Sequence, residues 1–297
     1  MTQLSRREFA ALAGATFAAP LAASQKTSRS AMTAQDVADR IRMNLGVEWK
    51  PDSIDGVKAG QPSTTARGIV TTSMATLDVL QRAVKAGSNI VITSLPTFYS
   101  RTDATNPPAG RPPTDRIFTA KNDFIAKHGI VIFRLSEHWR LRTPDPLAQG
   151  MAQALGWTKY QQAADASRFE VPELTLETLA GNVKRRLQSA GGVRVIGDPR
   201  IRVRRVGLLP GTTPVQASLK MLPEVDVIIA GEVREWESVE YVRDKAFAGE
   251  NKGLILVGRV VSEEPGMRVC ADWLKTLVPE VPVRHIAAGD PYWRPTR

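Results

Sequence analysis

The hydrophobic pattern of the chain alternates between helical and strand-like periods from Thr33 onward. Apolar residues recur three or four positions apart in a series of segments, which predicts helices at 33–45, 74–86, 115–127, 146–155, 174–190, 215–222, 237–247 and 266–277. The segments between them predict buried strands at 68–72, 89–93, 129–134, 193–196, 200–208, 226–230, 253–257 and 281–287. Since a strand–helix–strand order implies neighbouring parallel strands, the pattern predicts an α/β protein.

Polar residues follow one of these predicted strands directly. Ser136, Glu137 and His138 come after the strand at 129–134. Open α/β sheets bind ligands outside the carboxyl ends of their strands, so these side chains are candidates for a site. A segment at 102–115 holds four prolines and predicts a surface loop near the same edge.

The first 31 residues have the organisation of an export signal. Arg6 and Arg7 precede Phe9, and an apolar run rich in alanine and glycine follows from Ala10 to Ala23. An amphipathic helix would carry charged residues through that run, and none occurs there. The order resembles a twin-arginine signal, with cleavage expected within 22–31 and a periplasmic or extracellular mature protein.

Composition and charge limit the choice of partners. The 297 residues are enough for about two domains, and no apolar stretch is long enough to predict a membrane-spanning helix. The net charge of +10 could attract anionic partners. No nucleic-acid-binding motif accompanies the basic residues, so nucleic acid is not an expected partner and an anionic small molecule remains a candidate ligand.

Cysteine and histidine are both scarce. Cys270 is the single cysteine, so no intrachain disulfide can form, and its surroundings predict an amphipathic helix with a buried, inert thiol. The histidines are His128, His138 and His285. Because histidine is the commonest metal-binding side chain, three histidines provide few candidate ligands for a metal centre.

Residues 68–100, 133–140, 226–244 and 254–267 form separated strings that resemble segments of one family. It is the NIF-three-like family, the GTP cyclohydrolase type-2-like, dinuclear-metal proteins. Residues 68–100 resemble its N-terminal half, in which a strand ends in Thr-His-His-Pro or Thr-His-Glu-Pro. Residues 133–140 resemble a middle segment that supplies an aspartate, and residues 226–244 a segment with a Gly-Glu turn. Residues 254–267 resemble the C-terminal signature, a strand followed by Gly-His, a short spacer and Ser/Thr-Glu. The resemblance runs in the family's order from Thr33 to Pro295.

This resemblance implies a two-lobed fold with mixed β-sheets flanked by helices. It implies a first lobe at 32–145 plus 254–297 and a second at 146–253, after a cleaved signal at 1–31. It also implies that the Gly258–Glu263 turn reaches the Thr93–Pro96 turn, and that the chain forms a homo-oligomer, a toroidal hexamer in relatives.

The family's two metal ions are held by histidines and carboxylates at strand ends, and few of these positions are retained here. Glu263 matches the family's glutamate, and Glu137 stands where the aspartate falls. Ser94 and Leu95 stand where a histidine and a second ligand are expected, and Arg259 replaces the histidine after Gly258. Leucine cannot bind a metal and arginine repels one, so we expect no cofactor or a partially occupied divalent metal site.

Arg259 therefore suggests a different arrangement. A fixed cation at this position predicts an ion pair with Glu263 or Glu137 in place of at least part of the metal cluster. Glu263 and Glu264 could form a catalytic carboxylate pair, or could simply favour the start of a helix. His138 could be a ligand or general base, or a hydrogen-bonded structural histidine. Glu232 could line the pocket or be a surface charge.

Two classes of function follow from these residues. The replaced ligands favour an exported protein with a degenerate dinuclear metal site that is non-catalytic or binds a small ligand. The surviving Glu137, His138 and Glu263 keep open a metal-dependent hydrolase that acts on a small phosphorylated or heterocyclic substrate. If the chain is an enzyme, a hydrolase is therefore the expected class.

Overall fold

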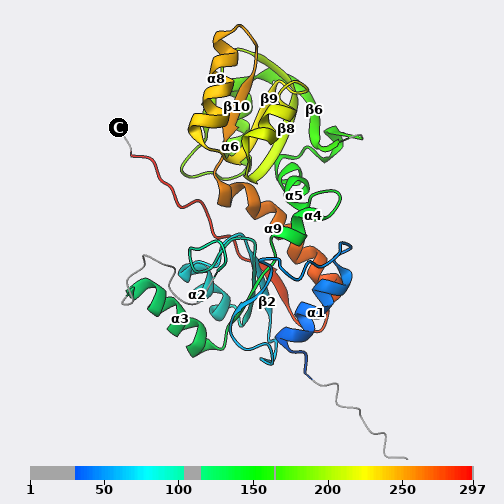
Figure 1. Ribbon diagram of the computed structural model, residues 1–297, viewed down its shortest axis with the longest axis vertical. Helices are drawn as coiled ribbons and strands as arrows, with labels where there is room; N and C mark the ends of the chain where they lie inside the picture. The colour runs from blue at the N-terminus through cyan, green and yellow to red at the C-terminus, as the bar shows by residue number, and fades with distance from the viewer. Residues whose placement is uncertain (1–30, 104–114, 164, 296–297) are drawn as a thin grey trace, which may run out of the picture. The chain divides into compact units, whose positions relative to one another are not determined.

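The computed structural model describes residues 31–103, 115–163 and 165–295. In this part of the chain, helices and strands alternate and form two mixed β-sheets (Figure 1). The expected export signal, but for Ala31, and the expected proline-rich loop, but for its ends, lie outside the described residues. None of the described helices is both long and apolar enough to cross a membrane.

The first sheet is largely parallel. Its strand order is β1-β4-β3-β2-β11, and β1 at one edge is antiparallel to β4. The other neighbours are parallel, as the strand–helix–strand pattern predicted. The strands are β1 (Gly56–Ala59), β2 (Ile69–Thr72), β3 (Ile90–Thr93), β4 (Val131–Arg134) and β11 (Val283–His285).

Helices cover both faces of this sheet. One hydrophobic cluster joins it to α2 (Leu77–Lys85) and α3 (Arg116–His128), and another joins it to α1 (Ala34–Asn44) and α9 (Arg259–Leu277). The short α4 (Glu137–Leu141) follows β4. Because both faces are buried, β2, β3 and β4 consist of continuous buried residues rather than alternating ones.

The second sheet has the order β5-β6-β8-β9-β10-β7. Its central pairs β8–β9 and β9–β10 are parallel, whereas β5–β6, β6–β8 and β10–β7 are antiparallel. The strands are β5 (Gln161–Gln162), β6 (Asp165–Thr175), β7 (Arg194–Ile196), β8 (Arg202–Thr212), β9 (Val227–Glu232) and β10 (Gly253–Leu256).

Helices also lie on both faces of the second sheet. One core cluster contains residues of α5 (Pro146–Leu155) and α6 (Leu176–Arg186), and the other contains residues of α7 (Val215–Met221) and α8 (Glu240–Phe247). Two short segments complete the order, the 3₁₀ helix η1 (Thr158–Tyr160) and the π-helix η2 (Glu235–Val239). The expected α/β class with two mixed, helix-flanked sheets is thus confirmed, while the lobe boundaries stay a prediction.

Helix α9 contributes to the cores of both sheets. Val261 in its first turn belongs to the α5–α6 cluster of the second sheet, whereas Met267 and Cys270 belong to the α1–α9 cluster of the first. Cys270 is fully buried, as predicted, and burial raises the pKa of its thiol. The polar residues between Val261 and Met267 therefore lie where α9 passes from one core to the other.

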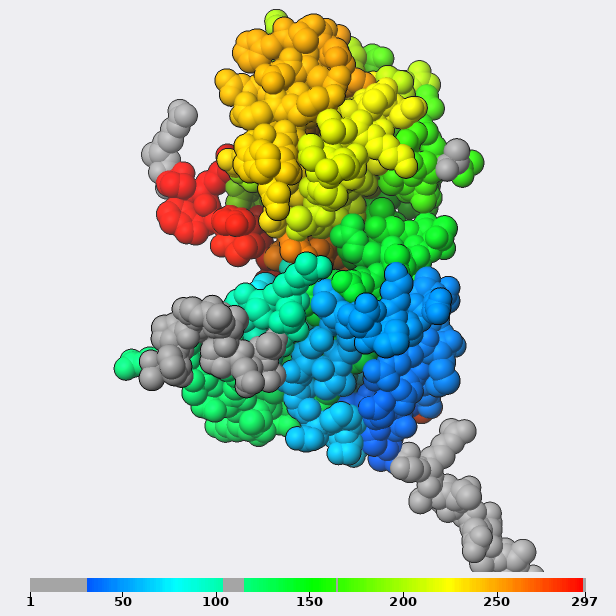
Figure 2. All heavy atoms as spheres, viewed as in Figure 1, coloured from blue at the N-terminus to red at the C-terminus, as the bar shows by residue number. Residues whose placement is uncertain are grey.

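The described C-terminal residues extend beyond β11 along the surface, drawn in red in Figure 2. Asp290 accepts hydrogen bonds from the Gly191 amide and the Ser189 hydroxyl, at 2.9 and 3.0 Å. Arg294 donates to the carbonyl oxygens of Gly191 and Val193. These contacts fasten the end of the chain to the segment that precedes β7.

Some elements differ from the prediction. Helix α9 begins at Arg259 rather than Gly266 and holds Pro265 in its second turn. Strand β8 continues to Thr212, beyond the strand predicted at 200–208. Strands β1, β5 and β6 were not predicted, because β1 and β5 are short edge strands and β6 is mostly only partly buried, with Glu170, Pro172 and Glu173 exposed.

Candidate functional site

Glu263 is the centre of the polar cluster at the start of α9. Glu263 is 2% exposed, and the Oε2 atom of its carboxylate accepts a hydrogen bond of 2.7 Å from the Ser94 hydroxyl. Ser94 directly follows β3, so the bond joins the carboxyl end of that strand to the second turn of α9. The expected approach of the Gly258–Glu263 turn to the Thr93–Pro96 turn is therefore confirmed.

Arg259 occupies the other oxygen of the same carboxylate. Its Nε donates to Glu263 Oε1 at 3.2 Å, one helical turn away. The Arg259 side chain is 37% exposed, whereas that of Glu263 is 3% exposed. The arginine–carboxylate pair predicted from the sequence thus forms with Glu263, and the carboxylate is buried with a partner on each oxygen.

A glycine at the end of β8 lets a second guanidinium approach. A Cβ atom on Gly211 would lie 2.8 Å from Glu263 Oε1 and 2.3 Å from Arg140 Nη1, so neither contact leaves room for a side chain. Gly211 also has a φ of +80°, a conformation that disfavours other residues. Arg140, from α4, is held in place by a hydrogen bond of 3.1 Å to the Pro210 carbonyl.

Arg140 also connects the cluster to an acidic residue. Its Nη2 lies 3.9 Å from Oδ2 of Asp145, whose side chain caps α5 by accepting from the Leu147 amide at 2.9 Å. Burial raises the pKa of the Asp145 carboxyl; Arg140 opposes this shift and the charge of Glu263 adds to it. Arg140 and Asp145 line a cavity of 430 Å³ together with Ser167, Pro210, Thr212 and Thr213. Arg140 is thus the residue through which the cluster borders this cavity.

Glu264 has partners of its own and does not pair with Glu263. Its Oε2 accepts from the Ser73 hydroxyl, directly after β2, and its Oε1 lies 3.1 Å from His285 Nε2 on β11. Thr71 Oγ1 donates to the Met267 carbonyl and lies 3.3 Å from Nδ1 of the same imidazole. The two adjacent glutamates thus bond to serines at the ends of adjacent strands rather than to each other.

His138 lies in a separate buried group. Its Nε2 accepts a hydrogen bond of 2.8 Å from the Lys50 amide, so the ring proton is on Nδ1, which donates to Asp55 Oδ2 at 2.9 Å. The imidazole stacks on Trp49 with ring centroids 4.0 Å apart. Asp55 also accepts from three amides at the start of α4, those of Ser136, Glu137 and His138. Both ring nitrogens of His138 therefore have protein partners.

The carboxylate of Glu137 points to this second group. Its Oε2 accepts from the Ser53 hydroxyl at 2.8 Å and from the Ile54 amide at 3.3 Å. Arg134, at the end of β4, is buried, and burial lowers the pKa of its guanidinium; Asp55 and Glu137 oppose this shift, while Arg259 adds to it. Arg134 therefore interacts electrostatically with charged residues of both groups.

The remaining sequence candidates contribute no polar contact to Glu263. Leu95 is 4% exposed and apolar. Glu232 ends β9 opposite Thr212, but its side chain is exposed. Within the described ranges, no set of three or more His, Cys, Asp or Glu residues is placed so that it could hold a metal ion.

Sequence reasoning missed Arg140, Asp145, Ser73 and Gly211. Arg140 lies two residues beyond His138 and Asp145 directly precedes a predicted helix, but no local pattern links either to Glu263. Ser73 lies between a predicted strand and a predicted helix. Gly211 lies inside β8, beyond the strand predicted at 200–208, and a glycine inside a strand often marks a close backbone approach.

The chain has two mixed sheets, and helices cover both faces of each. A polar cluster lies where strand ends meet the start of α9. These features define an α/β protein of the NIF-three-like class. The chain belongs to the Duf34/NIF3 (NGG1p interacting factor 3) family, whose model matches residues 32–289.

Solved structures share this fold at low sequence identity. The Staphylococcus aureus hypothetical protein SA1388 has a TM-score of 0.66 and 15% identity, over 90% of this chain and 100% of that one. A Bacillus cereus protein related to NIF3 has a TM-score of 0.65 and 14% identity, over 90% and 100%. Reduced HcgD from Methanocaldococcus jannaschii has a TM-score of 0.58 and 12% identity, over 86% and 97%. No curated protein is significantly similar in sequence.

Proposed function

We propose that this chain is a non-catalytic, exported member of the Duf34/NIF3 family, in which an internal ion-pair network takes the place of the dinuclear metal centre. The observation that carries the proposal is the Glu263 carboxylate, which has Ser94 on one oxygen and Arg259 on the other. A metal ion would have to displace both partners and would then face the Arg259 cation at short range.

The other carboxylate position supports the same proposal. Glu137 bonds to Ser53 and to the Ile54 amide, and His138 uses both ring nitrogens within the protein. Coordination of a metal by His138 would have to break a hydrogen bond that holds its buried ring to Lys50 or Asp55. The cost of leaving such a buried group unpaired opposes this rearrangement.

The ligand class that fits the cluster is a small anion. Arg259 and Arg140 are each about one third exposed, with side-chain exposures of 37%, and both lie beside Glu263. Arginine forms bidentate hydrogen bonds with carboxylate and phosphate groups. The adjacent cavity of 430 Å³ is within the usual range for small-molecule sites.

Export and assembly complete the proposal. The Arg6-Arg7 segment with its uncharged apolar run supports a twin-arginine route to the periplasm or the exterior. Replacing Arg6 and Arg7 with lysines should keep the full-length protein in the cytoplasm, and equal export of this variant would contradict the assignment. The family resemblance supports a homo-oligomer, which light scattering of the purified protein tests.

The metal experiment compares the natural chain with a variant that restores the family's histidines. Purified wild-type protein should hold less than one equivalent of metal, and calorimetric titration with Mn²⁺ and Zn²⁺ should give weak binding. The triple variant Ser94→His, Leu95→His, Arg259→His should bind at least one ion more tightly, because it supplies imidazole ligands and removes the cation. Two tightly bound ions in the wild type would overturn the proposal.

A hydrolysis screen separates the alternative function, a metal-dependent hydrolase. Phosphate esters and heterocyclic substrates are tested with added divalent ions, in the wild type and in Glu263→Gln. Activity in the wild type that the variant lacks would establish the hydrolase. The non-catalytic proposal expects no turnover in either protein.

A further inference from the structure

A separate cavity of 710 Å³ opens at the second sheet and is lined by none of the residues of the Glu263 cluster. It lies between η1, β6 and α6, with Leu155 and Gly156 at the end of α5. Its volume is within the usual range of small-molecule sites. Nothing in the proposed function uses it.

The cavity lies at the edge of a hydrophobic core. Leu155, Val171 and Leu179 are at most 5% exposed and belong to the α5–α6 cluster, whereas Trp157, Tyr160 and Leu174 pack against that cluster and are only partly buried. The Trp157 ring lies 6.1 Å from that of Phe169, centroid to centroid, which fixes its position. The apolar walls are formed by Leu155, Trp157, Tyr160, Val171, Leu174 and Leu179. An apolar surface gathered in a concavity gains free energy when a ligand removes it from water.

One end of the cavity carries unmatched positive charge. The last turn of α6 contributes Arg185 and Arg186, and neither has an ion-pair partner among the described residues. Arg185 donates to the neutral Asn182 side chain. Glu173 is the acidic residue at the cavity, but Arg202 lies 2.8 Å from its carboxylate and neutralises it.

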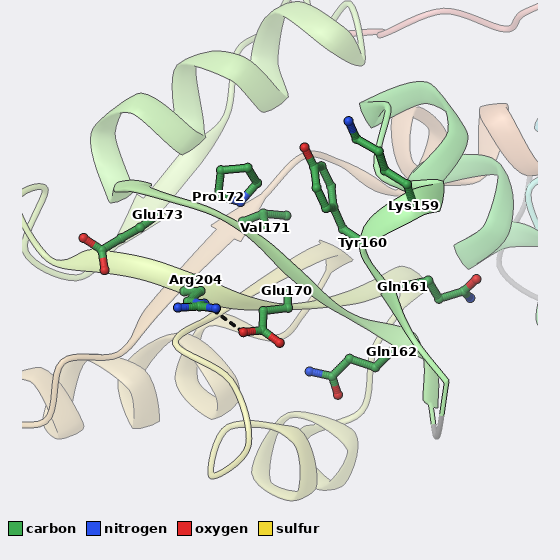
Figure 3. Close-up of a pocket in the computed structure, with 9 residues that line it drawn as sticks. All are labelled: Lys159, Tyr160, Gln161, Gln162, Glu170, Val171, Pro172, Glu173 and Arg204. Atoms are coloured by element: carbon green, nitrogen blue, oxygen red, sulfur yellow. Dashed lines mark ion pairs between the residues drawn. The ribbon is translucent and has the colours of Figure 1, made fainter.

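The adjoining groove, drawn in Figure 3, provides a contrast. It shares Tyr160 and the segment from Val171 to Glu173 with the cavity, and Tyr160 projects toward Pro172 and Val171. At the groove Arg204 pairs with Glu170 at 2.8 Å (Figure 3), and Glu173 pairs with Arg202 as it does at the cavity. This leaves Lys159, whose amine lies 5.0 Å from the centroid of the Tyr160 ring. Two adjacent arginines beside apolar walls are therefore a property of the 710 Å³ cavity and not of its neighbour.

Basic residues in the last turn of a helix also stabilise the helix dipole. That effect explains why α6 ends with Arg185 and Arg186. It does not explain why the two arginines lie at one open cavity together with the apolar Trp157, Tyr160 and Leu174.

We propose that this cavity binds an amphiphile with one apolar chain and one anionic head group, of which a medium-chain carboxylate is the simplest member. The chain lies against Trp157, Tyr160 and Leu174, and the carboxylate is held by Arg185 and Arg186. The site does not depend on the absence of metal at Glu263, so this proposal and the proposed function can each fail without the other.

Calorimetric titration of the full protein with decanoate tests this site, with decanol as the uncharged comparison. Decanoate should bind with one site per chain and at least tenfold more tightly than decanol. The double variant Arg185→Gln, Arg186→Gln should lose about tenfold or more in decanoate affinity and keep its decanol affinity, because charge-assisted hydrogen bonds are lost and the walls are intact. The matched control Arg268→Gln, Arg284→Gln removes the same charge from exposed positions outside the cavity and should bind decanoate like the wild type.

A blocking variant tests the location independently. Thr178 is exposed and lines the cavity, so Thr178→Trp should fill it without disturbing the core and should abolish decanoate binding while both arginines remain. Thermal melting confirms that each variant is folded. The proposal is overturned if the wild type does not bind decanoate, if decanol binds equally well, or if the control double variant loses as much affinity as the Arg185–Arg186 variant.

Discussion

The hydroxyl group of Ser94 donates a 2.7 Å hydrogen bond to the carboxylate of Glu263, although 169 positions separate the two residues. Both are buried, and they join the end of β3 to the start of α9. The resemblance to the family implies metal ligands at these two positions, and here a serine and a carboxylate bond directly to each other.

Replacing Ser94 with alanine should lower the free energy of unfolding by about 1–3 kcal/mol, because it leaves an oxygen of a buried carboxylate without its donor. Chemical denaturation measures the change. Ser238→Ala is the matched control: Ser238 is also buried, but its hydroxyl bonds to the neutral Ser218 hydroxyl at 3.1 Å. The control should lose less free energy of unfolding. An equal loss in both variants would show that the charge of Glu263 does not contribute to the effect of the Ser94 substitution.

Chelation should leave stability unchanged if the ion-pair network replaces the metal centre. Dialysis against EDTA is expected to shift the Tm by less than about 1 °C, since a ligand that is absent cannot contribute to stability by mass action. The triple histidine variant, loaded with Zn²⁺, should lose Tm under the same treatment. A large drop in the wild type would indicate a bound structural ion.

Gly211→Ala should destabilise the protein more than an ordinary glycine substitution at positive φ. The new Cβ would lie 2.3 Å from Arg140 Nη1 and 2.8 Å from Glu263 Oε1. Gly156→Ala is the control, since Gly156 has a φ of +77° and no atom within 4 Å of its Cβ position. The control should lower the free energy of unfolding by about 1 kcal/mol through backbone strain, and Gly211→Ala should lower it by about 1–3 kcal/mol more. Equal costs would mean that Arg140 and Glu263 move aside freely.

Lys121 should make stability rise with pH in an alkaline window. Burial lowers the pKa of its amine from 10.5 to about 8, and Nζ donates to the Thr97 carbonyl at 2.6 Å. Between these two values the unfolded chain binds a proton that the folded chain has released, so raising the pH favours folding. The contribution from pH 8 to pH 10.5 is roughly 2–3 kcal/mol.

Denaturation of wild type and Lys121→Met at several pH values measures this contribution. The difference in free energy of unfolding should move in favour of the wild type as pH rises through the window. Lys85→Met, at an exposed position on α2, should show no such trend. A difference between wild type and Lys121→Met that stays constant from pH 7 to pH 10 would contradict the assignment.

The sequence was informative where an element is buried on both faces. Strands β3 and β4 are continuous apolar runs and α2 and α5 have a clear helical period with caps, so their positions were predicted closely. Strand β6 was missed because its exposed residues, among them Glu170 and Glu173, interrupt the apolar pattern. The start of α9 was missed because Gly258 and Pro265 suggest a loop, since a proline beyond the first turn of a helix lacks the N–H that would bond to the carbonyl four residues before it.

The candidate site was predicted in part for a related reason. The pairing of Arg259 with Glu263 follows from their spacing of four residues on one helix, which sequence can show. The contacts of Arg140 and Asp55 depend on how distant segments pack, and no local pattern encodes them. The grouping of Glu137 and His138 with Asp55, away from Glu263, could likewise be seen only in three dimensions.

Adjacent glutamates on α9 bond to serines that follow adjacent strands, Glu263 to Ser94 and Glu264 to Ser73. Each bond alone would tolerate a small rotation of the helix. Together they hold the helix at two points around its axis, because neighbouring residues project about 100° apart on a helix. Rotation or sliding of α9 must break both hydrogen bonds at once. The orientation of α9 is therefore fixed cooperatively, and the first sheet and the core cluster that contains Val261 both depend on it.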